Sequence, residues 1–179
     1  MALAVGRVMI VEDLFHDPLR RSFAAMPEMD ALRDADALQE ADLVAVRVDV
    51  TRSIVALLFD LRSALQFRMA NTALLVGHGV QRFAWSRGIE PRAGRGAHYV
   101  MSSRPNNEHQ RFAIAIGCLQ SSKLDLEAVS AEFFVGDIPG LSESPPDFGR
   151  DDEATIEAGM PGWGSRFEPG WATFLDGAG

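Results

Sequence analysis

The feature that most constrains the fold of this 179-residue chain is an alternating segment, residues 43–50, in which every even position is valine. The odd positions of the segment differ in character and carry Leu43, Ala45, Arg47 and Asp49. A period of two is typical of a half-buried β-strand. The same period returns in residues 112–118, where one face holds Phe112, Ile114, Ile116 and Cys118. A β-sheet is therefore predicted.

Residues 54–61 predict a different kind of strand, because apolar side chains occupy both of its registers. Such a strand is typical of the centre of a sheet that is covered on both faces. A turn within residues 49–53 joins it to the first strand. Further strands are predicted at residues 73–76, 80–85, 98–102, 111–120 and 124–135, with a turn at 103–107. In the last strand the apolar register changes at Ala128 or Val129, which predicts a bulge.

The N-terminal part of the chain predicts a strand followed by a helix. Residues 7–12 are suited to a short strand, and Pro18 fits the first turn of a helix with Asp17 as its N-cap. One face of this helix would carry Leu19, Phe23 and Met26. Residues 28–41 are rich in Asp, Glu and Ala, and they predict a solvent-facing helical turn or a mobile connection.

The C-terminal part, from Gly136, is acidic and rich in proline and glycine, yet it carries five large aromatic side chains. This mixture predicts an arm that packs over the sheet, with one short helix near residues 151–158.

The elements together predict one α+β domain: a mainly antiparallel sheet of about six or seven strands, one N-terminal helix and the aromatic C-terminal arm. Its parts are the N-terminal strand and helix (1–41), the strand block (42–136) and the arm (137–179). Because the central strand needs cover on both faces, the helix is expected on one face and the arm on the other.

The composition bears on location. The longest mainly apolar stretch, residues 53–65, contains Asp60 and Arg62. It is shorter than the roughly 20 apolar residues that span a bilayer, so no membrane association is expected. The single cysteine, Cys118, excludes an internal disulfide, and no basic region precedes the first apolar tract as in a signal peptide. These features predict a cytoplasmic protein.

The net charge of −8 is concentrated at the two ends of the chain. Residues 1–52 carry a net −4 and residues 136–179 a net −7, whereas residues 53–135 carry +3. An acidic protein of this kind is a poor candidate for nucleic-acid binding, which needs clustered Lys and Arg. A basic protein is the more natural electrostatic partner.

The first candidate for chemistry is the acidic cluster of residues 12–17, which contains His16 and Asp17. Carboxylates beside a histidine can hold a divalent metal or position a water molecule for hydrolysis. The alternative is a capped helix start whose acids favour the positive end of the helix dipole. The alternative is preferred, because no second His or Asp motif with ligand spacing accompanies the cluster.

Other candidates are isolated residues. His78 lies between Gly77 and Gly79 and is either an acid or base at a sheet rim or a residue of a bulge. The two glycines lack the third glycine and following helix of a dinucleotide fingerprint, so no cofactor is predicted. Arg62 belongs to a positive central region that can bind an anion or pair with the arm. Cys118 is predicted to be a small buried residue rather than a nucleophile.

Two aromatic residues of the arm, Trp163 and Trp171, are either cover for the core or a contact patch. Burial is the preferred interpretation. If both tryptophans instead form a contact patch, a structural or oligomeric role with a symmetric interface is a further hypothesis.

The order of several features resembles that of a known class of protein. Phe15-His16-Asp17-Pro18-Leu19 is followed by Asp42-Leu43 with its alternating strand and by the segment from Val55 to Arg62. This arrangement is similar to small acidic bacterial single-domain families that include immunity proteins of toxin systems. The resemblance covers residues 12–85 and implies a non-catalytic protein that occludes the active site of a partner.

Two functions therefore remain open. The first is immunity-like protein binding without catalysis, in which the acidic surface meets a basic partner. The second is a small-ligand binder or metal-dependent enzyme with a pocket between sheet and arm, for which His16, Asp17, Arg62 and His78 are the candidate residues.

Overall fold

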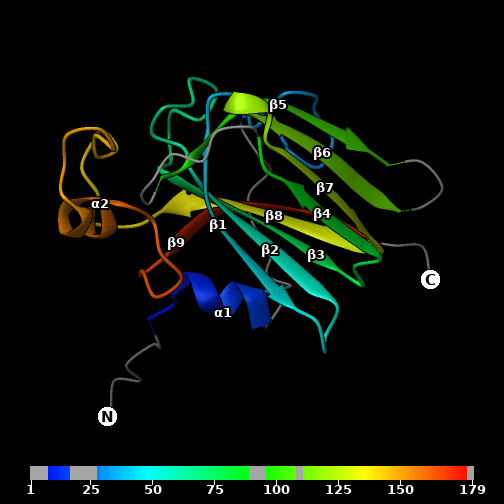
Figure 1. The fold of residues 1–179 in the computed structure, drawn as a ribbon. Coiled ribbons are helices and arrows are strands. Elements are labelled where there is room, and N and C mark those ends of the chain that lie inside the picture. Colours follow the sequence, from blue (N-terminus) through cyan, green and yellow to red (C-terminus); the bar gives the residue numbers. More distant parts are fainter. Residues whose placement is uncertain (1–7, 17–27, 89–95, 108–110, 177–179) are drawn as a thin grey trace, which may run out of the picture.

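The computed structural model describes residues 8–16, 28–88, 96–107 and 111–176 of the chain. Within these ranges nine strands form one antiparallel sheet in the order β4-β7-β6-β5-β1-β2-β3-β8-β9 (Figure 1). The strands are β1 (Asp42–Asp49), β2 (Ile54–Asp60), β3 (Thr72–His78), β4 (Arg82–Ser86), β5 (His98–Asn106), β6 (Phe112–Cys118), β7 (Lys123–Ala128), β8 (Ser130–Asp137) and β9 (Glu168–Leu175). The described helices are α1 (Val11–His16) and α2 (Glu153–Gly159), with a 3-10 turn at Leu119–Ser121.

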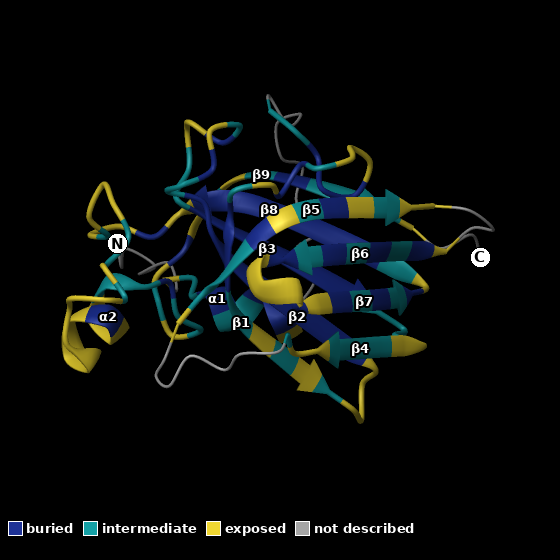
Figure 2. Cartoon of the chain, turned by 45° about the horizontal axis from the view of Figure 1, so that its top comes forward, coloured by how far each residue is buried: buried dark blue, intermediate teal, exposed yellow. Residues whose placement is uncertain are grey.

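The prediction of a mainly antiparallel sheet with few helices is confirmed, but the expected number of strands is wrong. The sheet has nine strands, because the segment 124–135 forms two strands and the arm ends in a strand of its own, β9. β2 is buried along its whole length and lies between β1 and β3, as its two-sided apolar sequence predicts (Figure 2).

The sheet is folded over, so that two halves face each other across one apolar core (Figure 1). One half contains β1, β2, β3, β8 and β9, and the other contains β5, β6, β7 and β4. The first half contributes Val55, Leu57, Phe59, Phe133 and Val135, and the second contributes Phe112, Ile114, Ile116, Leu124 and Leu126. Each of these side chains comes from one register of its strand, which is why the alternation in the sequence predicts the core.

Two long bent strands join the halves. β3 continues into β4 and β7 continues into β8, and the two pair with each other on both sides of the bend. At the bend Gly79 has a φ of +62°, and the Val129 amide donates to the His78 carbonyl at 3.0 Å. A change of direction at this point moves a strand from one packed layer to the other. The register change near Val129 is therefore a crossing between the two halves.

The outer face of the first half has a second apolar core, which α1 and the arm cover together. α1 contributes Val11, Leu14 and Phe15, and the arm contributes Phe167 and Ala172. Backbone hydrogen bonds join the two covers, from Val11 N to Ser165 O (3.1 Å) and from Glu12 N to Trp163 O (2.9 Å). The folded-over half of the sheet covers the inner face. The helix expected on the face opposite the arm begins after Pro18, outside the described residues, so its position stays a prediction.

Three local expectations also differ from the structure. Val11 and Glu12 begin a helix rather than end a strand, and Ile10 makes only an isolated bridge with Arg166. Residues 28–41 are not solvent-facing, since their turns bury Ala31, Leu32, Ala37, Leu38 and Ala41 in the inner core. Residues 103–106 continue β5 instead of forming a turn. The helix expected after Pro18 lies outside the described residues.

The predicted short helix of the arm corresponds to α2. Asp152 is its N-cap, and the Asp152 carboxylate accepts a hydrogen bond from the Thr155 amide at 2.7 Å. This contact explains the start of the helix, since a carboxylate satisfies amides that have no partner within the first turn. Neither described α-helix has the length and apolar character that a membrane crossing requires.

Candidate functional site

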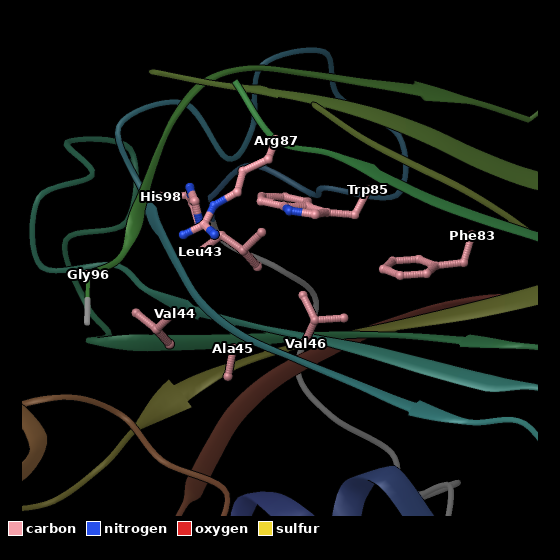
Figure 3. A pocket seen from close by; sticks show the side chains of 9 residues that line it. All are labelled: Leu43, Val44, Ala45, Val46, Phe83, Trp85, Arg87, Gly96 and His98. Carbon is pink, nitrogen blue, oxygen red and sulfur yellow. The ribbon is translucent and has the colours of Figure 1, made fainter. Parts of the chain in front are cut away.

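A pocket opens into the molecule between β1 and β4, and we call it the β1–β4 pocket. Its volume is about 510 Å³. Nine residues line it: Leu43, Val44, Ala45, Val46, Phe83, Trp85, Arg87, Gly96 and His98 (Figure 3). Six of the nine residues have an aliphatic or aromatic side chain, and glycine adds only backbone. The walls are therefore largely apolar. Ligand pockets of small molecules have this size and this character.

The pocket exists because β1 is paired on one side for only part of its length. β1 pairs with β2 from Asp42 to Asp49, but with β5 only at Asp42 and Leu43. Beyond Leu43 its second edge faces β4, which itself pairs only with β7 among the described strands. Contacts close the gap at both ends: the Val80 amide donates to the Ser53 carbonyl at 2.8 Å, and Trp85 contacts His98.

Two valines of β1, Val46 and Val48, lie on the inner side of the strand, whereas Val44 packs against the outer core after a register shift between Leu43 and Ala45. Arg47 lies on the outer face, with its guanidinium 4.8 Å from the ring centroid of Trp163. Its neighbours Val46 and Val48 therefore point to the inner side, where they are 38% and 48% exposed. Figure 3 shows Val46 directed toward the ring of Phe83 across the gap. Neighbouring apolar side chains along an unpaired strand edge are suited to form a contact surface.

The polar groups of the pocket are gathered at one end. The rings of Trp85 and His98 meet edge to face, with centroids 4.7 Å apart. The guanidinium of Arg87 reaches toward His98 and Leu43 in Figure 3. Burial and, second, the positive charge of Arg87 lower the pKa of His98. The imidazole is therefore neutral at neutral pH and can donate or accept a hydrogen bond.

In the acidic cluster that the sequence singles out, Glu12 lies near His16, with His16 Nε2 3.8 Å from a Glu12 carboxylate oxygen. The Glu12 carboxylate accepts from Arg47 at 2.5 Å, and one oxygen of Asp13 accepts from the Ile10 amide at 3.0 Å. His16 is exposed, with Nδ1 3.2 Å from Arg52 Nη1, and Asp17 lies outside the described residues. Across the described ranges no three His, Cys, Asp or Glu side chains come together as a metal site.

The side chain of Arg62 is buried, and its ion pair and hydrogen bonds join parts of the fold. Its side chain is only 3% exposed and forms an ion pair with Asp60 at 2.5 Å. The same guanidinium donates to the carbonyls of Ser142 (3.1 Å), Ser144 (3.1 Å) and Gly159 (2.7 Å). It thereby ties the arm to the end of β2. A second hollow of about 580 Å³ lies beside it, between the segment 62–71 and arm residues 137–143.

His78 does not share a site with Arg62. His78 pairs with Ile54 at one end of the β2–β3 ladder, whereas Asp60, the partner of Arg62, lies at the other end. The His78 Nε2 is 3.2 Å from a carboxylate oxygen of Glu132. Gly77 and His78 belong to β3 itself, so only Gly79 forms the turn. The candidate residues His16, Arg62 and His78 thus form no common constellation.

The arm tryptophans contact different cores. Trp163 packs on the outer core and lies over Arg47, and Trp171 packs against the inner core from β9. Cys118 is buried, and burial, followed by the negative charge of Asp42, raises the pKa of its thiol to about 11. A thiol with such a pKa is not a nucleophile at neutral pH.

Sequence reasoning placed β1 and β4 as strands, but it did not single out Phe83, Trp85, Arg87 or His98 as site residues. These side chains come together only because His98 pairs with Leu43 and β4 ends beside it. The alternation of residues 43–50 indicated only a half-buried strand, so no local signal marked these residues as a site. In comparisons with protein-family models, curated proteins and solved structures, no match to this chain was found.

Proposed function

We propose that this protein is a non-catalytic binding protein that holds a small, mainly apolar molecule in the β1–β4 pocket. The observation that carries the proposal is an apolar gap of about 510 Å³ between two unpaired strand edges, closed at both ends by contacts within the chain. Pockets at the mouths of β-barrels and between strands are common sites for such ligands. Removing Val46 and Phe83 from water supplies the binding energy.

Octanol is a suitable first probe, because it is neutral and its binding depends on the apolar walls alone. Each buried methylene contributes about 0.8 kcal/mol, so a dissociation constant below about 1 mM is expected by calorimetry with the full chain. Val46→Trp should abolish binding, since the larger ring fills the gap opposite Phe83. Val50→Trp is the matched control, because Val50 is 83% exposed and does not line the pocket.

Absence of octanol binding to the full chain, or equal loss of binding in the two variants, would contradict the proposal. Thermal unfolding of each variant, followed by circular dichroism, shows whether a loss of binding has a folding cause.

Immunity-like protein binding is the second candidate, and the free edge of β1 favours it. The edge from Val44 to Asp49 offers backbone groups and alternating exposed valines, which an extended segment of a partner can pair with. Acidic side chains near α2, including Asp151, Asp152 and Glu153, suit a basic partner.

A co-purifying toxin-like protein is the test of this second candidate. On binding by strand addition it should slow hydrogen exchange of the amides between Val44 and Asp49, because these groups would gain partners. A neighbouring gene product that leaves this exchange unchanged would refute strand addition.

A further inference from the structure

We infer that the β1–β4 pocket selects amphipathic monoanions, whose apolar body lies against Val46 and Phe83 and whose carboxylate lies between Arg87 and His98. This inference rests on the proposed function, which it makes more specific. It assigns a class of ligand, small monocarboxylic acids with an aliphatic or aromatic body, to a site defined by its lining residues.

The first support is the charge of the lining. None of the nine lining residues is acidic, although the chain carries a net charge of −8. Arg87 forms no ion pair with any carboxylate of the described residues, whereas eight other described arginines do: Arg33, Arg47, Arg52, Arg62, Arg82, Arg104, Arg150 and Arg166. An arginine beside an apolar pocket that pairs with no carboxylate among the described residues is suited to the carboxylate of a ligand.

The second support is the position of the donors. Figure 3 shows the nitrogen atoms of Arg87 and His98 together at one end, with Phe83 and Val46 at the other. A ligand that lies along the pocket therefore meets an apolar wall first and hydrogen-bond donors at its end. The edge-to-face contact between Trp85 and His98, at 4.7 Å between centroids, holds the imidazole in place.

The third support is that the polar end of the pocket distinguishes between the head groups of candidate ligands. The exposed guanidinium of Arg87 attracts a carboxylate and repels an ammonium group, with the modest strength of a charge pair in contact with solvent. The imidazole can donate its N–H to a carboxylate oxygen, which satisfies a second lone pair. A neutral hydroxyl group gains only an ordinary hydrogen bond. The expected order of affinity is therefore acid, then alcohol, then amine.

Octanoate, octanol and octylamine are the probes, because they share a chain length and differ in the charge of the head group. Calorimetry with the full chain at neutral pH should show octanoate binding about fivefold or more tighter than octanol. Octylamine should bind more weakly than octanol. Arg87→Gln should remove the preference for octanoate, so that octanoate and octanol bind to this variant with similar affinity. Arg87→Lys should retain part of the preference, because the charge remains but the planar fork is lost.

Arg82→Gln is the matched control. Arg82 is the first residue of β4, the strand that ends just before Arg87; it lies outside the pocket, is exposed, and pairs with Glu127 at 3.6 Å. Its loss should leave the order of the three probes unchanged. Equal binding of octanoate and octanol to the native chain, or equal effects of Arg87→Gln and Arg82→Gln, would overturn this inference and leave the proposed apolar pocket intact. Failure of all three probes would instead refute the proposed function.

Discussion

At the scale of single residues, Arg62 joins a buried ion pair with Asp60 to hydrogen bonds with three carbonyls of the arm. Both side chains are almost fully buried, at 3% and 1% exposure. Arg62→Met should lower the free energy of unfolding by about 3–5 kcal/mol, because it leaves a buried carboxylate without its partner. Urea unfolding measures the loss. Arg68→Met, at an exposed arginine of the adjacent segment, is the control, and an equal loss there would contradict the prediction.

Asp42 is a residue whose ionisation opposes folding. Burial, followed by the negative charge of Asp60, raises the pKa of Asp42 from 3.8 to about 6, although Arg62 partly offsets this. The folded chain therefore holds the proton more tightly than the unfolded chain, and stability falls as pH rises from about 4 through 6. Asp42→Asn should raise the free energy of unfolding by about 1–3 kcal/mol at pH 8 and by only about 0.5 kcal/mol at pH 4.

Asp49 is a control of opposite sign for this pH dependence. The Thr51 hydroxyl and the Arg52 amide lower the pKa of Asp49, so ionisation there favours the folded chain. Asp49→Asn should give no gain in stability at pH 8. A gain from Asp42→Asn that persists unchanged at pH 4 would show that its cause is not the titration of Asp42.

At the scale of elements, the bend shared by β3–β4 and β7–β8 determines how the two halves of the sheet meet. A methyl group added at Gly79 would lie 2.9 Å from Cγ2 of Val129, and the φ of +62° is unfavourable for alanine. Gly79→Ala should lower the free energy of unfolding by about 1–3 kcal/mol. Gly140→Ala separates the causes, because Gly140 also has a positive φ, +89°, but no atom within 4 Å of an added methyl. If both variants lost the same free energy of unfolding, the close contact with Val129 would not contribute to the loss at Gly79.

The strands that the sequence predicts well are those with one clear apolar register. β6 matches the alternation of residues 112–118, and β2 matches its two-sided burial. The turn predicted at residues 103–107 is wrong because Ser, Pro and Asn favour turns only where no tertiary contact competes. Here the Ser103 carbonyl accepts from the Asp36 amide, and the Ser103 amide donates to the Asp36 carboxylate at 3.1 Å. These distant contacts keep the segment in β5.

At the scale of the whole molecule, the candidate site depends on tertiary contacts that the sequence pattern does not predict. Alternation shows that Val46 and Val48 share a face, but it does not reveal that this face lies opposite the unpaired edge of β4. That arrangement follows from the bend at Gly79 and from the two-residue pairing of β1 with β5. Both depend on contacts between residues far apart in the sequence. The pocket is therefore a consequence of how the sheet folds over, which no local pattern encodes.

The same scale explains why α1 and the arm act as one cover of the outer face. Phe15 and Trp163 have ring centroids 6.4 Å apart, and Arg47 lies against both rings. Phe15→Ala and Trp163→Ala should therefore be non-additive, with a coupling of about 0.5–1.5 kcal/mol in urea unfolding.

Phe133 provides the control for this coupling, because it lies in the inner core on the opposite face of the sheet. Phe15→Ala and Phe133→Ala should add within about 0.5 kcal/mol, since the two rings belong to separate apolar cores. If the Phe15 and Trp163 substitutions were equally additive, α1 and the arm would contribute to stability as two separate covers. A coupling confined to Phe15 and Trp163 requires that loss of either element loosens the other, as expected from the backbone hydrogen bonds that join them.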